Sequence, residues 1–330
     1  MSRLIAYSKT YKPFHFPEFV NHAIDHESMF WGEWEASLQR DVNQWKDGTV
    51  TEQEKDHITQ ILRLFTQSDQ IVGGSYVDVF LPYFKNNEVR MALLSIANRE
   101  STHMRAYALL NDTLGLPDTE YRAFLEYEEM AEKAEFMEDF ESPLEYENVS
   151  GRQRTTHMGL NLARTVMNEG MSLFSAFVQL LNYQRPEAGS KMLGMGEIVE
   201  WSVRDETKHV EIMAQLFKRH CEENPSIVTD DFKKTIYDMY RTGVDLEDKF
   251  IELSYRLGGS PALDKEDVKQ YIRFIADRRL VQLGLKPNWN VETNPLPWVD
   301  HIISGDTQKN FFEGRVTDYN HKGLEGDWGW

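Results

Sequence analysis

Two Glu-x-x-His units offer the residues best suited to hold a metal ion, Glu100 with His103 and Glu206 with His209. Residues three apart lie on one face of a helix, so each unit can present a carboxylate and an imidazole to one ion. Both pairs lie on the apolar stripe of a predicted helix, the face that is expected to be buried. A buried carboxylate without a partner is strongly unfavourable. Because few Lys or Arg residues share these stripes, the pattern favours metal binding over buried salt bridges.

Two other predicted helices each place a single acid in the same way. Asp69 follows Phe65 on one apolar stripe, and Glu169 precedes Leu173 on another. Four carboxylates and two neutral imidazoles balance two divalent ions, and a neutral cluster is what a buried site tolerates. Oxygen and imidazole ligands without thiolates favour iron or manganese. An acid followed by Glu-x-x-His, repeated once, matches the arrangement of ferritin-like di-iron and di-manganese bundles.

A third Glu-x-x-His match, Glu54 with His57, has a different explanation. Thr51 and Glu54 form a capping box, which predicts a solvated first helical turn and not a metal site. His22 and His26, four residues apart, also have ligand-like spacing. No second charged helix completes a site there, so we expect surface or polar core roles for both.

The pattern of apolar residues predicts an all-α protein, because helical spacing is frequent and strand-like alternation is scarce. Helices are predicted to begin at Thr51 and to cover residues 88–111, 119–135, 158–183, 195–220, 230–257 and 265–283. We predict one helical domain over residues 1–304. Residues 305–330 are rich in Gly and charge but carry aromatic residues, which predicts a poorly ordered tail that docks on a partner.

Composition limits the class of protein. The 330 residues carry a formal net charge of −18, which argues against nucleic acid or an anionic membrane surface as the main partner. No apolar run is long enough to span a membrane, and the N-terminus lacks the features of a signal peptide, so we expect a cytoplasmic protein. The single cysteine, Cys221, excludes an internal disulfide framework.

Together these motifs resemble the small subunit of class I ribonucleotide reductase. The resemblance is carried by residues 29–31, 51–55, 99–107, 204–209, 271–276, 294–298 and 311–319. Three details separate this family from other di-iron bundles. The first ligand is an aspartate, Asp69; Tyr107 stands four residues after His103; and Asp205 directly precedes the second Glu-x-x-His unit.

The resemblance implies a ferritin-like helical bundle with two divalent metal ions in its core. One ion would be held by Asp69, Glu100 and His103, and the other by Glu169, Glu206 and His209. Two irons are the default, and two manganese ions use similar ligands. The cluster would react with oxygen or a reduced derivative and oxidise Tyr107 to a radical. Trp31, Asp205 and His103 would relay this radical, and Tyr319 in the tail would be its last station before the partner.

The resemblance also implies the partners. A homodimer would act with a large subunit that reduces ribonucleotides to deoxyribonucleotides. In this family that reaction needs a thiyl radical and a dithiol, and Cys221 alone cannot supply both. The nucleotide site must therefore lie on the large subunit. Whether a separate flavoprotein activates the cluster is left open.

Some features depart from the family pattern and leave alternatives open. Gly32, Glu33 and Trp34 stand where Pro-Glu-Glu is usual, so Trp34 is a rival to Trp31 for the relay. The connection after the Glu169 helix is longer than usual. The terminal Trp328 and Trp330 do not map onto the family pattern, and their role is not assigned. The rival functions are a di-metal oxidase or hydroxylase of the same fold and a ferritin-like storage protein.

Overall fold

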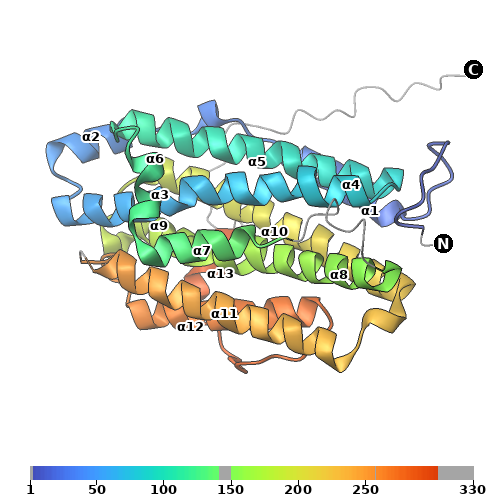
Figure 1. Ribbon diagram of the computed structural model, residues 1–330. Coiled ribbons are helices and arrows are strands. Elements are labelled where there is room, and N and C mark those ends of the chain that lie inside the picture. The colour runs from blue at the N-terminus through green and yellow to red at the C-terminus, as the bar shows by residue number, and fades with distance from the viewer. Residues whose placement is uncertain (1–2, 141–149, 257, 304–330) are drawn as a thin grey trace, which may run out of the picture.

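The computed structural model describes residues 3–140, 150–256 and 258–303, and these residues form helices and connections without a β-strand. The long helices run side by side in an elongated bundle (Figure 1). The prediction of an all-α protein is thus confirmed. The α-helices are, in chain order, α1 (Pro17–Ser28), α2 (Gln39–Asp47), α3 (Glu52–Ser75), α4 (Leu81–Tyr83), α5 (Asn87–Leu114), α6 (Glu120–Ala123), α7 (Glu128–Glu138), α8 (Gly151–Met167), α9 (Phe174–Leu181), α10 (Leu193–Glu223), α11 (Asp230–Tyr255), α12 (Lys265–Gln282) and α13 (Pro297–Ile303).

Helix ends follow the capping signals of the sequence. The Thr51 hydroxyl accepts a hydrogen bond from the Glu54 amide, and the Glu54 carboxylate accepts one from the Thr51 amide, which confirms the capping box of α3. α5 ends at Gly115, whose φ of 78° is the left-handed conformation that favours glycine. α8 begins seven residues before the predicted position, because a second capping box, Ser150 with Gln153, starts it.

The predicted helix over residues 158–183 is not continuous. A π-helical segment, Asn168–Ser172, separates α8 from α9, and a second one, Tyr76–Phe80, follows α3. A π turn takes one more residue than an α turn, and such turns frequently occur at functional sites. Residues 119–135 likewise divide into α6 and α7, with a short 3₁₀ turn between them.

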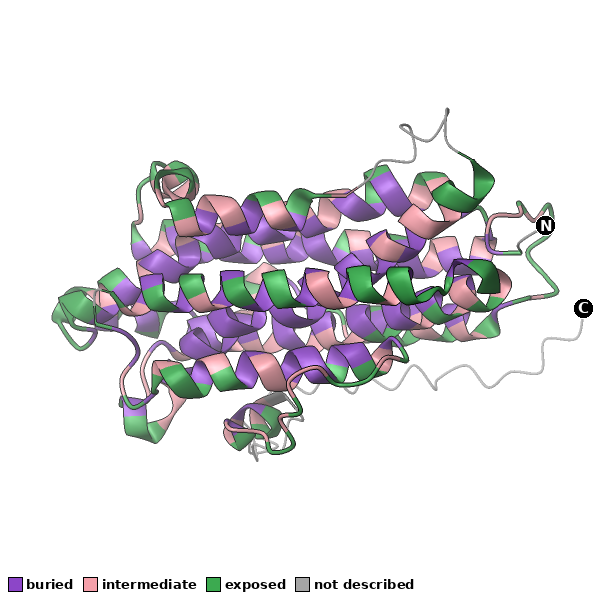
Figure 2. Ribbon diagram, turned by 60° about the horizontal axis from the view of Figure 1, so that its bottom comes forward, coloured by how far each residue is buried: buried purple, intermediate pink, exposed green. Residues whose placement is uncertain are grey.

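The segments that carry the candidate ligands are neighbours in the bundle. α5 packs against both α3 and α10, and α8 packs against α10. α11 and α12 cover the side of α7, α8 and α9 that faces away from α5 (Figure 1), and α1 lies along α5. Buried residues line the inward faces of these helices, and exposed residues lie on the outer faces and at the ends (Figure 2).

No helix in the described ranges combines the length and the apolar character that a membrane crossing needs. The predicted tail, residues 305–330, and Tyr319 within it lie outside the described residues.

Candidate metal centre

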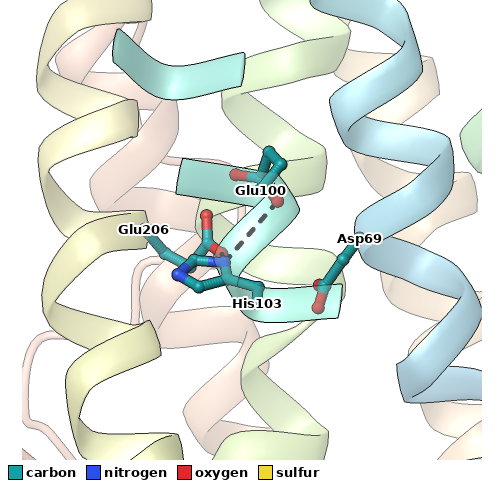
Figure 3. A group of neighbouring side chains, drawn as sticks. All are labelled: Asp69, Glu100, His103 and Glu206. Atoms are coloured by element: carbon teal, nitrogen blue, oxygen red, sulfur yellow. Dashed lines mark ion pairs between the residues drawn. The ribbon is translucent and has the colours of Figure 1, made fainter. Parts of the chain in front are cut away.

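Three helices bring one group of ligand atoms together in the core (Figure 3). Asp69 comes from α3, Glu100 and His103 from α5, and Glu206 from α10. One oxygen or nitrogen atom of each residue lies within 4.8 Å of those of the others, and all four side chains are buried. His103 Nδ1 lies 3.6 Å from Glu100 Oε2 and 3.2 Å from Glu206 Oε1. The imidazole therefore turns Nδ1 towards the carboxylates.

A second group adjoins the first and shares two of its residues. Glu169, from the π-helical segment, and His209, from α10, gather with Glu100 and Glu206 within the same 4.8 Å limit. His209 Nδ1 lies 3.0 Å from Glu100 Oε1, 3.3 Å from Glu169 Oε2 and 3.0 Å from Glu206 Oε2. The six side chains therefore form one continuous group, which we call the carboxylate–histidine cluster.

The cluster has the chemistry of a site for two cations. Asp69 Oδ2, Glu206 Oε1 and His103 Nδ1 are buried and make no well-formed hydrogen bond within the described part of the chain. Burial, together with the neighbouring carboxylates Glu100 and Glu169, raises the pKa of the Asp69 and Glu206 carboxyl groups well above the ordinary values, although His103 opposes this shift. Two divalent ions would satisfy these atoms and balance four carboxylates. The residues fit the implied metals.

Trp31 and Asp205 continue from the cluster on the side of His103. His103 Nε2 lies 3.1 Å from Asp205 Oδ2, and the Trp31 indole Nε1 donates a hydrogen bond of 2.7 Å to the same oxygen. Burial opposes the charge of Asp205, but the hydrogen bond from His103 and the nearby Arg99 guanidinium lower its pKa to about 2. Trp34, by contrast, is 65% exposed. Of the two tryptophans, only Trp31 is in contact with Asp205 in this geometry.

Tyr107 lies one helical turn after His103 and is fully buried. Its hydroxyl donates a hydrogen bond of 3.0 Å to Ser202 Oγ, and the Phe65 ring packs edge-on against it with centroids 4.5 Å apart. Burial and the charge of Asp69 raise the pKa of the Tyr107 phenol well above its ordinary value. The phenol therefore keeps its proton at neutral pH.

Tyr76 lies at the cluster, although the sequence analysis did not name it as a site residue. Tyr76, at the start of the second π-helical segment, is buried and donates a hydrogen bond to Glu169 Oε1. It stands seven residues after Asp69 on the same apolar stripe, so the sequence already indicated that both residues share one helix face. Its partner Glu169 lies 93 residues away, and nothing in the sequence indicates this pairing.

Two expectations for histidines outside the cluster were incomplete or wrong. His26 has a polar core role, but it lies at the cluster itself, with Nε2 3.2 Å from His209 Nε2 and Nδ1 2.7 Å from Ser95 Oγ. The buried stripe of α1, which ends in His26, was the available signal. His57 is not in a solvated turn: it is fully buried, with its two nitrogens 2.8 Å from Tyr183 Oη and 3.0 Å from Gln179 Oε1.

One face of the first turn of α3 is buried: Glu54 is covered, whereas Glu52 and Gln53 stay exposed. Lys191 Nζ lies 2.8 Å from Glu54 Oε1, and this ion pair brings the segment before α10 over the capping box. A local motif cannot reveal such cover. The capping box was therefore identified correctly from the sequence, and the solvent exposure of His57 was not.

Helical bundles that gather carboxylates and histidines in their core form the ferritin-like class, and the fold and the cluster define this chain as one of them. The family model for the ribonucleotide reductase small chain matches residues 8–295. The chain belongs to the ribonucleotide reductase small-chain family, and the resemblance drawn from the sequence is confirmed.

Two relatives agree with this membership, and a solved structure has a similar fold. The probable ribonucleoside-diphosphate reductase small subunit 048L of Invertebrate iridescent virus 3 is 38% identical over 340 residues, which cover 99% of this chain and 88% of the viral protein. The ribonucleoside-diphosphate reductase subunit beta of Chlamydia pneumoniae is 30% identical over 300 residues, which cover 89% of this chain and 84% of the bacterial protein. The fold resembles that of the ribonucleotide reductase R2 subunit from Clostridium botulinum, with a TM-score of 0.79 at 21% identity and coverage of 90% and 91%.

These similarities identify the chain as a ribonucleoside-diphosphate reductase small subunit. They do not favour the oxidase and storage alternatives.

Proposed function

We propose that this small subunit holds two divalent ions in the carboxylate–histidine cluster, forms a radical on Tyr107 and delivers it to a large subunit that reduces ribonucleotides. The observation that carries the proposal is the chain of hydrogen bonds that runs from His103 of the cluster through Asp205 to Trp31. An oxidase that acts on a substrate bound at the metals does not need a chain of hydrogen bonds that leads away from them. The proposal includes a cytoplasmic location, in the same compartment as the large subunit.

When bound, the ions would let oxygen or a reduced derivative of it act as the oxidant that takes one electron from Tyr107, and iron is our first choice with manganese as the alternative. The protein controls what happens to the phenol. Its proton lies in the hydrogen bond to Ser202, and the Phe65 ring covers the phenol ring. Full burial keeps water and reductants away from Tyr107. These contacts favour a long-lived radical.

Delivery would use residues on the other side of His103. The buried Asp205 carboxylate accepts hydrogen bonds from both His103 and Trp31, so it orients both rings and can hold a proton between them. The Trp31 ring stacks on the His103 ring with centroids 5.8 Å apart and 23° between their planes. We propose that Tyr319, outside the described residues, is the exit to the large subunit.

The proposal includes a homodimer, which the outer face of α1 and α5 supports. Ile24, Phe30, Leu94 and Leu109 are among the exposed large apolar side chains. Phe30 and Leu94 line the same surface cleft, together with Met91. The net charge of −18 makes two copies repel one another, and the burial of an apolar face of this kind supplies the attraction that would offset this repulsion. Sedimentation analysis of Leu94→Lys should show a loss of dimer.

Metal analysis with electron paramagnetic resonance tests the central claim. The purified chain is loaded separately with iron and with manganese, and exposed to oxygen, to peroxide, or to oxygen with a reduced flavoprotein. We expect two ions per chain and a tyrosyl signal under at least one condition, which also identifies the metal and the need for a flavoprotein. Tyr107→Phe should keep the metals and lose the signal, whereas Tyr240→Phe, a buried tyrosine away from the cluster, should keep both.

The same assay tests the ligands. His103→Ala or His209→Ala should reduce the bound metal, whereas His57→Ala should not, because its ring contacts Tyr183 and Gln179. An unchanged radical in Tyr107→Phe would refute the assignment of the radical to this residue.

A further inference from the structure

The two histidines of the cluster contact different chemical groups with the ring nitrogen that faces away from the carboxylates. Both turn Nδ1 towards the carboxylates, so the supporting contact falls on Nε2. Behind His103 stands the charged Asp205, at 3.1 Å. Behind His209 stands a second imidazole, that of His26, with Nε2 to Nε2 at 3.2 Å and the ring planes 81° apart.

The contact between the two imidazoles determines where their protons lie. A neutral imidazole has one N–H donor and one lone-pair acceptor. His209 Nδ1 faces Glu100, Glu169 and Glu206, and it must offer a lone pair to a cation bound there. The proton of His209 therefore lies on Nε2, and it is donated to His26 Nε2.

The remaining nitrogen of His26 completes the chain of hydrogen bonds. Because its Nε2 accepts, its proton lies on Nδ1, which donates to Ser95 Oγ at 2.7 Å. The direction of both hydrogen bonds thus follows from the need for a lone pair at the metal position. His26 comes from α1, which carries none of the six cluster residues, and it is 1% exposed.

We propose that His26, held by Ser95, is a positioning residue that sets the ring orientation and tautomer of His209 and so tunes one of the two metal positions. The inference rests on the proposed function, since it assumes that the cluster binds metal. Partners behind metal-ligating histidines fix the tautomer and raise ligand basicity, and their loss typically lowers metal affinity about 10- to 100-fold.

A neutral partner behind His209 and a charged one behind His103 have a further consequence. A carboxylate that accepts the imidazole proton makes that imidazole a stronger electron donor than a neutral acceptor does. The two metal positions are therefore inequivalent, and the position at His209 binds its ion more weakly. This difference originates in α1, outside the helices that carry the cluster.

Cobalt(II) binding measures this effect without any turnover, because its visible spectrum reports the ligands. Titration of the wild-type chain should resolve two ions. His26→Leu should weaken one of them about 10- to 100-fold and leave the other unchanged. His26→Gln should retain most of the affinity, because its amide can accept from His209 and donate to Ser95. His57→Gln changes a buried histidine away from the cluster and should leave both affinities unaltered.

A surface cleft allows a second test that does not depend on how His26→Leu folds. The cleft has a volume of about 470 Å³, and its lining includes His26, Ser95 and Arg99. In His26→Gly, free imidazole can enter through the cleft and take the place of the missing ring. Because the cleft belongs to the proposed dimer face, Leu94→Lys is added to this variant and to its control so that the cleft stays open. Added imidazole should restore the cobalt spectrum and the affinity of the weakened position in this variant. It should not change His57→Gly.

The outcomes separate this inference from the proposed function. Two ions bound by His26→Leu with wild-type affinity and spectrum would overturn the role of His26 and leave the metal centre intact. A His26→Gly protein that binds both ions equally well with and without imidazole would do the same. A wild-type chain that binds no cobalt would refute the metal centre itself.

Discussion

Trp31 and Asp205 lie 174 residues apart in the chain and are joined by a hydrogen bond of 2.7 Å from the indole Nε1 to Oδ2. The same oxygen lies 3.1 Å from His103 Nε2. One carboxylate oxygen thus connects a residue that precedes α2 with the cluster on α5 and α10. A buried carboxylate that accepts two hydrogen bonds remains ionised, which agrees with the lowered pKa of Asp205.

The first prediction compares the two tryptophans. Trp31→Phe removes a buried hydrogen bond to a charged group, so the free energy of unfolding should fall by about 2 kcal/mol. Metal content should remain, and turnover with the large subunit should be lost. Trp34→Phe alters an exposed side chain and should change stability by less than about 0.5 kcal/mol and keep turnover. If the two variants exchanged these behaviours, Trp34 would be the relay residue.

The second prediction concerns the tail, which lies outside the described residues. Tyr319→Phe should assemble the metal centre and the Tyr107 radical normally, because the cluster draws its side chains from the helical bundle. It should be inactive with the large subunit. Radical yield is measured on the isolated chain, and turnover and binding are measured with the partner. Removal of residues 305–330 should also weaken that binding. Full turnover by Tyr319→Phe would exclude it as the exit, and Trp328 and Trp330 would be tested next.

The third prediction is a pH dependence of stability caused by His57. Burial lowers the pKa of its imidazole to about 4, whereas the unfolded chain binds the proton near pH 6.5. The unfolded chain therefore binds this proton more readily than the folded one as the pH falls from about 6.5 towards 4. The free energy of unfolding falls by about 3 kcal/mol over this range. Urea unfolding at several pH values measures it.

His57→Gln should show a shallower loss of stability with acid than the wild type over this interval. Equal slopes for the wild type and His57→Gln would show that the buried imidazole does not control acid stability.

The fourth prediction concerns a buried ion pair away from the cluster. Lys133 Nζ lies 2.5 Å from Glu247 Oε1, and both side chains are almost fully buried. Glu247→Gln leaves the ammonium without a charged partner and should lower the free energy of unfolding by about 3–5 kcal/mol. The double variant Lys133→Met with Glu247→Leu should recover most of this loss, because no unpaired charge remains.

Denaturant unfolding compares these variants with Asp238→Asn, which breaks an exposed pair with Lys234. That change should alter stability by about 0.5 kcal/mol or less. A Glu247→Gln protein as stable as Asp238→Asn would mean that the buried lysine finds another partner or water.

The sequence by itself determined the features that depend on local geometry. Three-residue spacing places Glu100 beside His103 and Glu206 beside His209 on any helix, whatever surrounds it. The capping box at Thr51 and the terminal Gly115 likewise act within a single turn. Helical periodicity also predicted which face of each helix is buried, and thus where the acids of the cluster lie.

Only the tertiary structure decided the features that need two distant segments. His26 meets His209 across 183 residues, and Tyr76 meets Glu169 across 93. The burial of His57 depends on Gln179 in α9 and on Tyr183 just after that helix, more than 120 residues later in the chain. The physical reason is that helix periodicity fixes the face a side chain occupies but not the helix that packs against it. That partner is set by how all the apolar faces are buried together.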